Sequence, residues 1–226
     1  MKLLPALFLC LIIGSCAAQT SKELDADGFE KGINSAKVQV LDVRTDGEYK
    51  SGHIKNALLA DWTNAQQFTD RTQYLDKSKP VYIYCLSGGR SSAAAKSLRK
   101  QGYDVLELKG GINGWKSAGK PLENNSNAKQ MTLDEYAALI NSAPVVLVDF
   151  GAEWCPPCKQ MEPVLQALNT EKKKEFKFVK VDGGNDIEVM KQNGVEALPV
   201  FIIYKNGKQV WKKQGIVSKE ELEKNL

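Results

Sequence analysis

Apolar residues in the first half of the chain fall into short runs separated by helix-like segments. Residues 38–43 alternate between apolar and polar and then end, and residues 81–84 and 105–108 are compact apolar runs of strand length. Between the last two runs, residues 91–100 are rich in alanine and read as a helix. Strands that alternate with helices predict a mainly parallel sheet, and hence an α/β domain.

The second half of the chain repeats this organisation but ends differently. An apolar run at 145–150 is followed by apolar residues at helical spacing over 160–168. The Asn-Gly pair at 206–207 predicts a tight hairpin between strands at 200–204 and 209–213. We therefore expect a second α/β domain.

Two segments lack the periodic apolar pattern of a folded core, one before the first domain and one between the two domains. Residues 1–15 carry Lys2 and then an apolar run that ends in small residues, which is typical of an export signal and too short to span a bilayer. Residues 122–130 are polar and aperiodic, and we interpret them as a linker before the capping-box sequence of Thr132 and Glu135. The expected domains are residues 22–121 and 131–226.

The composition indicates a globular protein with few reactive groups. The chain has 226 residues, of which 42% are hydrophobic and 26% charged, so each half can bury a core. A net charge of +4 is too small to indicate nucleic-acid binding. Of five cysteines, Cys10 lies in the leader and Cys16 at its end. The odd number that remains, with His53 as the only histidine, indicates reactive thiols rather than a disulfide framework or a metal site, and no cofactor is implied.

Two cysteines, Cys155 and Cys158, follow the predicted strand of the second half and begin its predicted helix, with Trp154 just before them. Strand, C-x-x-C and helix in this order are typical of a redox site. The helix N-terminus favours the Cys155 thiolate, and Cys158 can close a reversible disulfide one turn on. A zinc site is disfavoured because it needs further ligands, and a structural disulfide because so short a loop is reducible. We expect Cys155 to be the exposed nucleophile and Cys158 the buried resolver.

Cys85 follows the predicted strand at 81–84 and begins a second candidate site. Gly88 and Gly89, after Ser87, allow a tight turn whose N–H groups point inward as a nest for an anion. Arg90 opens the next helix and adds that helix's N-terminal dipole. Such a loop favours a thiolate and would also hold a persulfide anion. The alternative is a buried structural cysteine, which the two glycines and the arginine disfavour.

Several separated motifs of the first half resemble a single rhodanese-like domain over about residues 22–121. They are Asp42-Val43-Arg44, Glu48-Tyr49, Gly52-His53-Ile54, the loop from Cys85 to Arg90, and Gly110-Gly111-x-x-Gly114-Trp115. The resemblance implies a sulfurtransferase whose loop cysteine, Cys85, carries a persulfide, with Asp42, Arg44, Glu48 and His53 as framework around the loop. Four residues separate Cys85 from Arg90, as in sulfurtransferases, whereas the related phosphatases and arsenate reductases have five. The loop has no further charge, so the sulfur donor is left open.

The second half resembles thioredoxin over its full length. The resemblance implies that Asp149 is the buried acid handling the proton of the second cysteine, that Lys180 lies near it, and that Pro199 is the cis-proline beside the disulfide. Two residues depart from the family pattern. Gly151 stands where thioredoxin usually has an aromatic residue, and Pro156 replaces the usual glycine between the cysteines. The resemblance therefore implies the fold of thioredoxin for this half but not its reduction potential. The direction of electron flow through Cys155 and Cys158 is left open.

The leader ends in Ile13-Gly14-Ser15-Cys16, which resembles the lipobox of bacterial lipoproteins. The resemblance implies cleavage before Cys16 and acylation of that cysteine, which would anchor the protein in the bacterial cell envelope, facing the periplasm. The alternative is ordinary cleavage after Ala18 and release of a soluble protein.

These observations predict an exported thiol–disulfide oxidoreductase coupled to a rhodanese-like carrier of sulfane sulfur. Its expected partners are protein thiol or disulfide clients, a membrane thiol that donates or accepts electrons, a sulfane-sulfur donor and the membrane. Nucleic acid and metal are not expected. In the alternative function, the rhodanese-like domain only docks clients and transfers no sulfur, which the intact loop around Cys85 disfavours.

Overall fold

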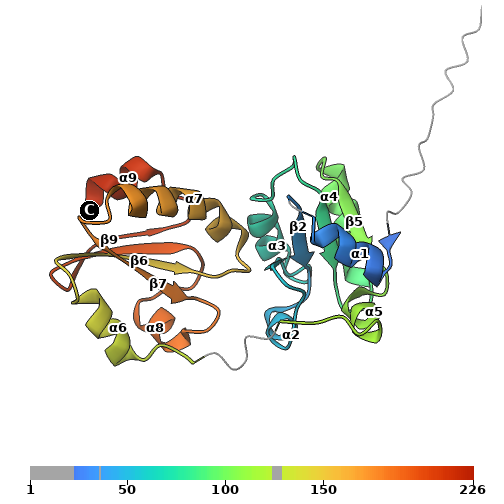
Figure 1. The fold of residues 1–226 in the computed structure, drawn as a ribbon, viewed down its shortest axis with the longest axis horizontal. Helices are drawn as coiled ribbons and strands as arrows, with labels where there is room; N and C mark the ends of the chain where they lie inside the picture. The colour runs from blue at the N-terminus through green and yellow to red at the C-terminus, as the bar shows by residue number, and fades with distance from the viewer. Residues whose placement is uncertain (1–22, 36, 124–128) are drawn as a thin grey trace, which may run out of the picture.

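The computed structural model describes residues 23–35, 37–123 and 129–226, which form two α/β units (Figure 1). The predicted leader, with Cys10 and Cys16, and most of the predicted linker lie outside the described residues. Within the described part, no helix is both long and apolar enough to cross a bilayer.

The first domain is built on a five-stranded sheet in the order β1-β5-β4-β2-β3, in which every neighbouring pair is parallel, as predicted. The strands are β1 (Glu23–Leu24), β2 (Gln39–Asp42), β3 (Ala57–Leu59), β4 (Val81–Tyr84) and β5 (Val105–Leu108). The helices are α1 (Ala26–Ile33), α2 (Asp46–Lys50), α3 (Ala65–Thr72), α4 (Gly89–Lys100) and α5 (Gly111–Ser117). The sequence pattern did not reveal β1, β3, α2, α3 or α5.

Alternate residues of the central strands supply two cores, one on each face of this sheet. Val40 and Tyr82 pack on the side covered by α1 and α5, whereas Leu41 and Ile83 pack on the side covered by α3 and α4. Burial on both faces explains why β4 is a continuous apolar run in the sequence. Cys85 follows β4 directly and therefore lies at the carboxyl edge of the sheet.

The second domain has a mixed four-stranded sheet in the order β7-β6-β8-β9, with α6 and α8 on one face and α7 and α9 on the other. The strands are β6 (Val145–Gly151), β7 (Lys177–Asp182), β8 (Val200–Lys205) and β9 (Lys208–Gln214). The helices are α6 (Leu133–Ile140), α7 (Pro156–Glu171), α8 (Ile187–Gln192) and α9 (Lys219–Asn225).

Three local predictions for the second domain are confirmed. β8 and β9 form an antiparallel hairpin around Asn206 and Gly207, whose φ angles of 49° and 73° are positive. Thr132 and Glu135 form the reciprocal capping box that starts α6. The Leu198–Pro199 peptide bond is cis.

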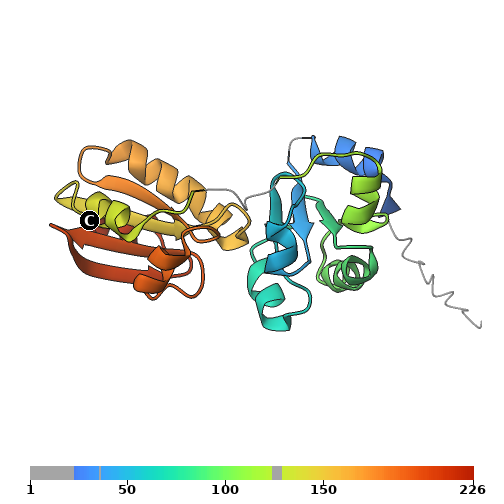
Figure 2. The same cartoon turned by 90° about the horizontal axis from the view of Figure 1, so that it is seen from below.

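The two domains meet where the amino-terminal end of α7 approaches β3 and α3 (Figures 1 and 2). The Leu59 N–H donates to the Trp154 carbonyl at 2.8 Å, and Gln160 Nε2 donates to the Tyr74 carbonyl at 3.1 Å. Because β3 is an edge strand, the outward N–H of Leu59 is available for this bond, whereas Ala60 N–H points inward to Asp42. The redox motif therefore contacts the first domain directly.

Candidate functional site

Cys155 and Cys158 are joined in a disulfide at the start of α7. Cys155 is the N-cap residue, and its Sγ accepts the Cys158 N–H at 3.3 Å. Pro156 and Pro157 occupy the first helical positions, where a proline costs no hydrogen bond because those N–H groups have no partner within the helix. The backbone N–H and the helix dipole together stabilise a thiolate on Cys155 when the disulfide is reduced.

The expected exposure of the two cysteines is wrong for this structure. Cys155 is 2% exposed and Cys158 is 9% exposed, so the predicted nucleophile is the more deeply covered of the two. Both sulfurs, with Trp154, belong to one apolar cluster that includes Leu59 of the first domain. Contact with the other domain, which a local motif does not reveal, reverses the exposure order.

Trp154 is held between the domains by more than one contact. Its carbonyl accepts the Leu59 N–H, and its ring lies under the guanidinium of Arg71, at 4.6 Å from the ring centroid. Arg71 Nη1 also donates to the Leu59 carbonyl at 3.0 Å. Arg71 therefore links the edge of the first sheet to the residue that precedes the redox pair.

Asp149 lies in β6, directly across from Lys180 on the neighbouring strand β7. Asp149 is 8% exposed, and burial raises the pKa of its carboxyl to about 6, although the positive charge of Lys180 opposes the shift. A carboxyl with this pKa can hold or release a proton near neutral pH. The acid that the sequence predicted is thus buried, with Lys180 close enough to act on it.

Pro199 is also buried, and its neighbour Leu198 packs against the cluster that contains the two cysteines. The cis bond turns the chain at this point into β8. The corner therefore lies beside the disulfide, as expected from the family pattern.

The Cys85 loop has the anion-binding geometry that its sequence predicted. The Gly88 N–H points to Cys85 Sγ at 3.1 Å, and Ser91 Oγ lies 3.4 Å from the same sulfur. Burial raises the pKa of the Cys85 thiol, but these hydrogen bonds, with that of the Ser87 N–H, outweigh it and leave the pKa below its ordinary value. Gly88 has a φ of 111°, which permits the turn.

Arg90 faces a carboxylate rather than the sulfur. Its guanidinium makes a two-pronged ion pair with Glu48 at 2.6 and 2.8 Å. The hydrogen bond from Arg90 lowers the pKa of Glu48 to about 2, with help from Thr45 and against the effect of burial. Asp42 and Arg44 form a second pair, buried, at 2.6 Å. These contacts match the predicted framework for Asp42, Arg44 and Glu48, whereas His53 stacks on Tyr49 and lies beside Glu123.

Sequence reasoning assigned no role in these sites to three residues that the structure places there. Ser91 bonds the Cys85 sulfur, Arg71 covers Trp154, and Gly111 lies under the loop. A side chain on Gly111 would begin 2.5 Å from the Cys85 carbonyl oxygen, so only glycine fits there. The glycine-rich motif at 110–114 was the available signal for Gly111, whereas a lone serine or arginine gives none. Across the described ranges, no cluster of three or more His, Cys, Asp or Glu residues could hold a metal ion.

Comparisons with known proteins divide the chain at the same place. Residues 25–118 match the family model described as a rhodanese-like domain, and residues 127–226 match the thioredoxin model. Thioredoxin of Chlamydia muridarum is 41% identical over 91 residues, which cover 40% of this chain and 87% of that protein.

Other relatives match only in part. Chloroplastic thioredoxin Y of rice (Oryza sativa subsp. japonica) is 36% identical over 96 residues, which cover 42% of this chain and 57% of that protein. The chain thus spans little more than half the length of this relative. A solved structure of a rhodanese-like domain protein from Staphylococcus aureus is 32% identical, with a TM-score of 0.41, over 46% of this chain and 99% of that one.

Proposed function

Because the chain belongs to the thioredoxin family through its second domain and carries a rhodanese-like domain before it, we propose that it reduces sulfane sulfur carried by its own Cys85. The thioredoxin domain implies disulfide exchange with protein thiols as its general activity. The proposal adds that Cys155 and Cys158 also act on the first domain of the same chain.

The proposed reaction has two steps. The reduced Cys155 thiolate attacks the outer sulfur of a Cys85 persulfide, which leaves a Cys155 persulfide and a Cys85 thiolate. The Cys158 thiolate then attacks Cys155 Sγ and expels hydrosulfide, so that one sulfane sulfur is reduced and the cysteine pair is oxidised to its disulfide. A thiol donor must then restore the pair.

The observation that carries this proposal is the contact between the redox motif and the first domain. Trp154, next to Cys155, rests on Leu59 and Arg71. Cys85 belongs to the same buried cluster as Leu58 and Ala60, the two neighbours of Leu59, so the Cys85 loop and the strand at the covered face share one core. Reduction of an outside client requires that this contact open, whereas the first domain already lies against the redox motif.

The alternative function, in which the first domain docks clients without carrying sulfur, makes a different prediction. Incubation of the full chain with thiosulfate and cyanide tests it, because a persulfide on Cys85 yields thiocyanate. We expect thiocyanate formation that Cys85→Ser abolishes and that survives the joint replacement of Cys155 and Cys158 by serine. A rate that Cys85→Ser does not change would favour the docking function.

Export and lipid anchoring are part of the same proposal. The pattern at residues 13–16, with Cys16 last, supports acylation at that cysteine. Mass spectrometry of protein expressed in a bacterial host should find acylated Cys16 as the first residue of a membrane-bound chain. Soluble protein with an unmodified N-terminus at Gln19 would contradict anchoring. A second acyl group would make the attachment stable, since a single chain binds reversibly.

A further inference from the structure

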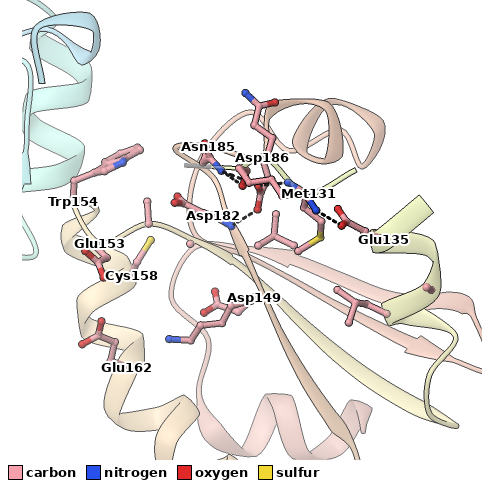
Figure 3. Close-up of a pocket in the computed structure, with 18 residues that line it drawn as sticks. Met131, Glu135, Asp149, Glu153, Trp154, Cys158, Glu162, Asp182, Asn185 and Asp186 are labelled. Carbon is pink, nitrogen blue, oxygen red and sulfur yellow. Dashed lines mark hydrogen bonds and ion pairs between the residues drawn. The ribbon is translucent and has the colours of Figure 1, made fainter. Parts of the chain in front are cut away.

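A pocket of about 1020 Å³ opens behind the disulfide, between α6, α7 and the strands β6 and β7 (Figure 3). Of the two cysteines, only Cys158 is among the described residues that line it. The disulfide thus has two different surroundings, since Cys155 lies in the covered contact with the first domain and Cys158 borders open space.

Gly151 makes this space available. In β6, residues two apart point to the same face of the sheet, so a side chain at 151 would lie over Asp149. A Cβ on Gly151 would sit 3.2 Å from Asp149 Oδ1 and 3.6 Å from Oδ2. Since this position has no side chain, both the Asp149 carboxyl and Cys158 border the pocket.

The Asp149 carboxyl, which is 8% exposed, makes no hydrogen bond or ion pair with another described residue and is influenced only by the nearby charges of Lys180 and Glu162. Figure 3 shows its carboxyl pointing toward the side on which Cys158 and Glu162 lie. Every fully enclosed side-chain nitrogen or oxygen of the described residues has a hydrogen-bond partner, so the Asp149 oxygens keep access to the pocket, where water or a ligand can satisfy them.

The charge on the pocket wall selects the kind of ligand. Two lysines, Lys129 and Lys180, are outnumbered by six carboxylates, from Glu135, Asp149, Glu153, Glu162, Asp182 and Asp186. Glu135 is paired with Lys129, and Glu162 with Lys159. An excess of negative charge in a hollow attracts cations and repels anions.

We propose that this pocket binds a small aminothiol, which reaches Cys158 from the side opposite to the first domain. The ammonium group would face the carboxylates and the thiol would face Cys158 and Asp149. The pocket would thereby admit a reductant while Cys155 stays covered. The site depends on the redox pair alone and does not rest on sulfur transfer from Cys85.

The chemistry of the disulfide favours attack of the aminothiol at Cys158 Sγ. Asp149 takes the proton of the incoming thiol, whose sulfur bonds to Cys158 Sγ as the S–S bond breaks. The leaving thiolate is Cys155, which the helix N-terminus and the Cys158 N–H stabilise, and a thiol of lower pKa leaves faster. A second aminothiol then attacks the ligand sulfur of the mixed disulfide and releases an aminothiol disulfide and the Cys158 thiol. Two thiols are oxidised and one protein disulfide is reduced.

Charged methanethiosulfonate reagents test access to Cys158 directly. In the full chain with Cys155→Ser, Cys158 is a free thiol, and peptide mass spectrometry distinguishes it from Cys85. We expect the aminoethyl reagent to modify Cys158 about tenfold faster than the sulfonatoethyl reagent, after each rate is divided by that for a free cysteine derivative. The preference should shrink as salt is added.

Variants that fill the pocket locate the route. Gly151→Leu adds a side chain that fills the pocket from β6. Ala138→Trp narrows the pocket from an exposed position on α6. The second variant is the safer one for folding, because Ala138 is exposed. Each should slow the aminoethyl reaction several-fold, whereas Gly47→Leu, on α2 with open space around it, should not.

Two results would overturn the proposal. Equal normalised rates for the two reagents would remove the preference for a cation. If the folded Ala138→Trp variant reacts with the aminoethyl reagent as fast as the parent does, the reagent reaches Cys158 by a route other than the pocket. Cysteamine and 3-mercaptopropionate provide the matching test on the intact disulfide, and the proposal expects cysteamine to reduce it faster.

Discussion

The guanidinium carbon of Arg71 lies 4.6 Å from the ring centroid of Trp154, and the two residues belong to different domains. Burial lowers the pKa of Arg71 to about 10, against the charges of Asp46 and Asp61, so the side chain is still charged at neutral pH. Leu59 completes the contact, since its carbonyl accepts from Arg71 and its N–H donates to Trp154. This three-residue arrangement covers the residue next to the redox pair.

Replacement of Arg71 by alanine should open the covered contact. A cation–π interaction of this kind contributes about 0.5–2 kcal/mol, which corresponds to an increase of about 2- to 30-fold in the open population. Reduced Cys155 should then react faster with iodoacetamide by that factor. The rate is measured by peptide mass spectrometry on the full chain.

Lys77→Ala is the matched control for this prediction. Lys77 also lies over an aromatic ring, that of Tyr103, but within the first domain. The variant should leave the alkylation rate of Cys155 unchanged. If both variants react like the parent, the contact seen at Trp154 does not limit access to Cys155.

Replacement of Ser91 by alanine should raise the pKa of the Cys85 thiol. Ser91 Oγ is one of the donors that lower this pKa, and the loss of a donor disfavours the thiolate. The pH midpoint for alkylation of Cys85 should move upward by about one unit, which corresponds to about 1.4 kcal/mol. Ser92→Ala, at the next position, should not move it. An unshifted midpoint in Ser91→Ala would exclude this role.

Replacement of Asp149 by asparagine should stabilise the fold at neutral pH. The folded pKa of about 6 lies above the ordinary value of 3.8, so the folded protein holds this proton more tightly than the unfolded chain. The carboxyl therefore lowers the free energy of unfolding increasingly as pH rises from 3.8 to about 6. Urea denaturation should show that Asp149→Asn raises the free energy of unfolding by about 3 kcal/mol above pH 6. Below the pH that corresponds to the ordinary pKa, the variant should leave the free energy of unfolding unchanged. A gain that does not vary with pH would contradict the pKa assignment.

The sequence predicted the elements that local patterns control. The capping box at Thr132, the hairpin at Asn206 and the parallel strands around Val81 follow from caps, turns and apolar runs, and the structure has all of them. The three-residue strand β3 is too short to leave a pattern. Its position at the sheet edge depends on contacts that distant parts of the chain provide.

The sites were predictable to the extent that their motifs are local. Cys85 follows a recognisable strand and Asp149 lies in one, whereas Cys155 belongs to a C-x-x-C motif at the start of α7, so all three could be selected from the sequence. Exposure was not predictable, since burial of Cys155 depends on Leu59 of another domain. Gly151 was visible as a departure from the family pattern, but the pocket that it opens depends on the packing of α6 and α7 against the sheet.

Trapping of clients tests the roles of the two redox cysteines. Cys158→Ser leaves Cys155 without its resolving partner, so mixed disulfides with protein thiol clients should accumulate on Cys155. Because Cys155 is 2% exposed, addition of Arg71→Ala should increase the yield. Cys155→Ser should trap few proteins, since its remaining thiol lines the pocket. Equal trapping by both single variants would show that the assignment is wrong.

The transfer of sulfur within one chain is tested most directly by the release of sulfide. Cys85 is loaded with sulfane sulfur on protein whose Cys155 and Cys158 are reduced, and hydrosulfide is followed as the protein is diluted. We predict a first-order rate constant that does not change with protein concentration, because the tether holds both sites at high effective concentration. An apparent first-order rate constant that falls in proportion to protein concentration, or that a mixture of Cys85→Ser and Cys155→Ser chains reproduces, would contradict the account.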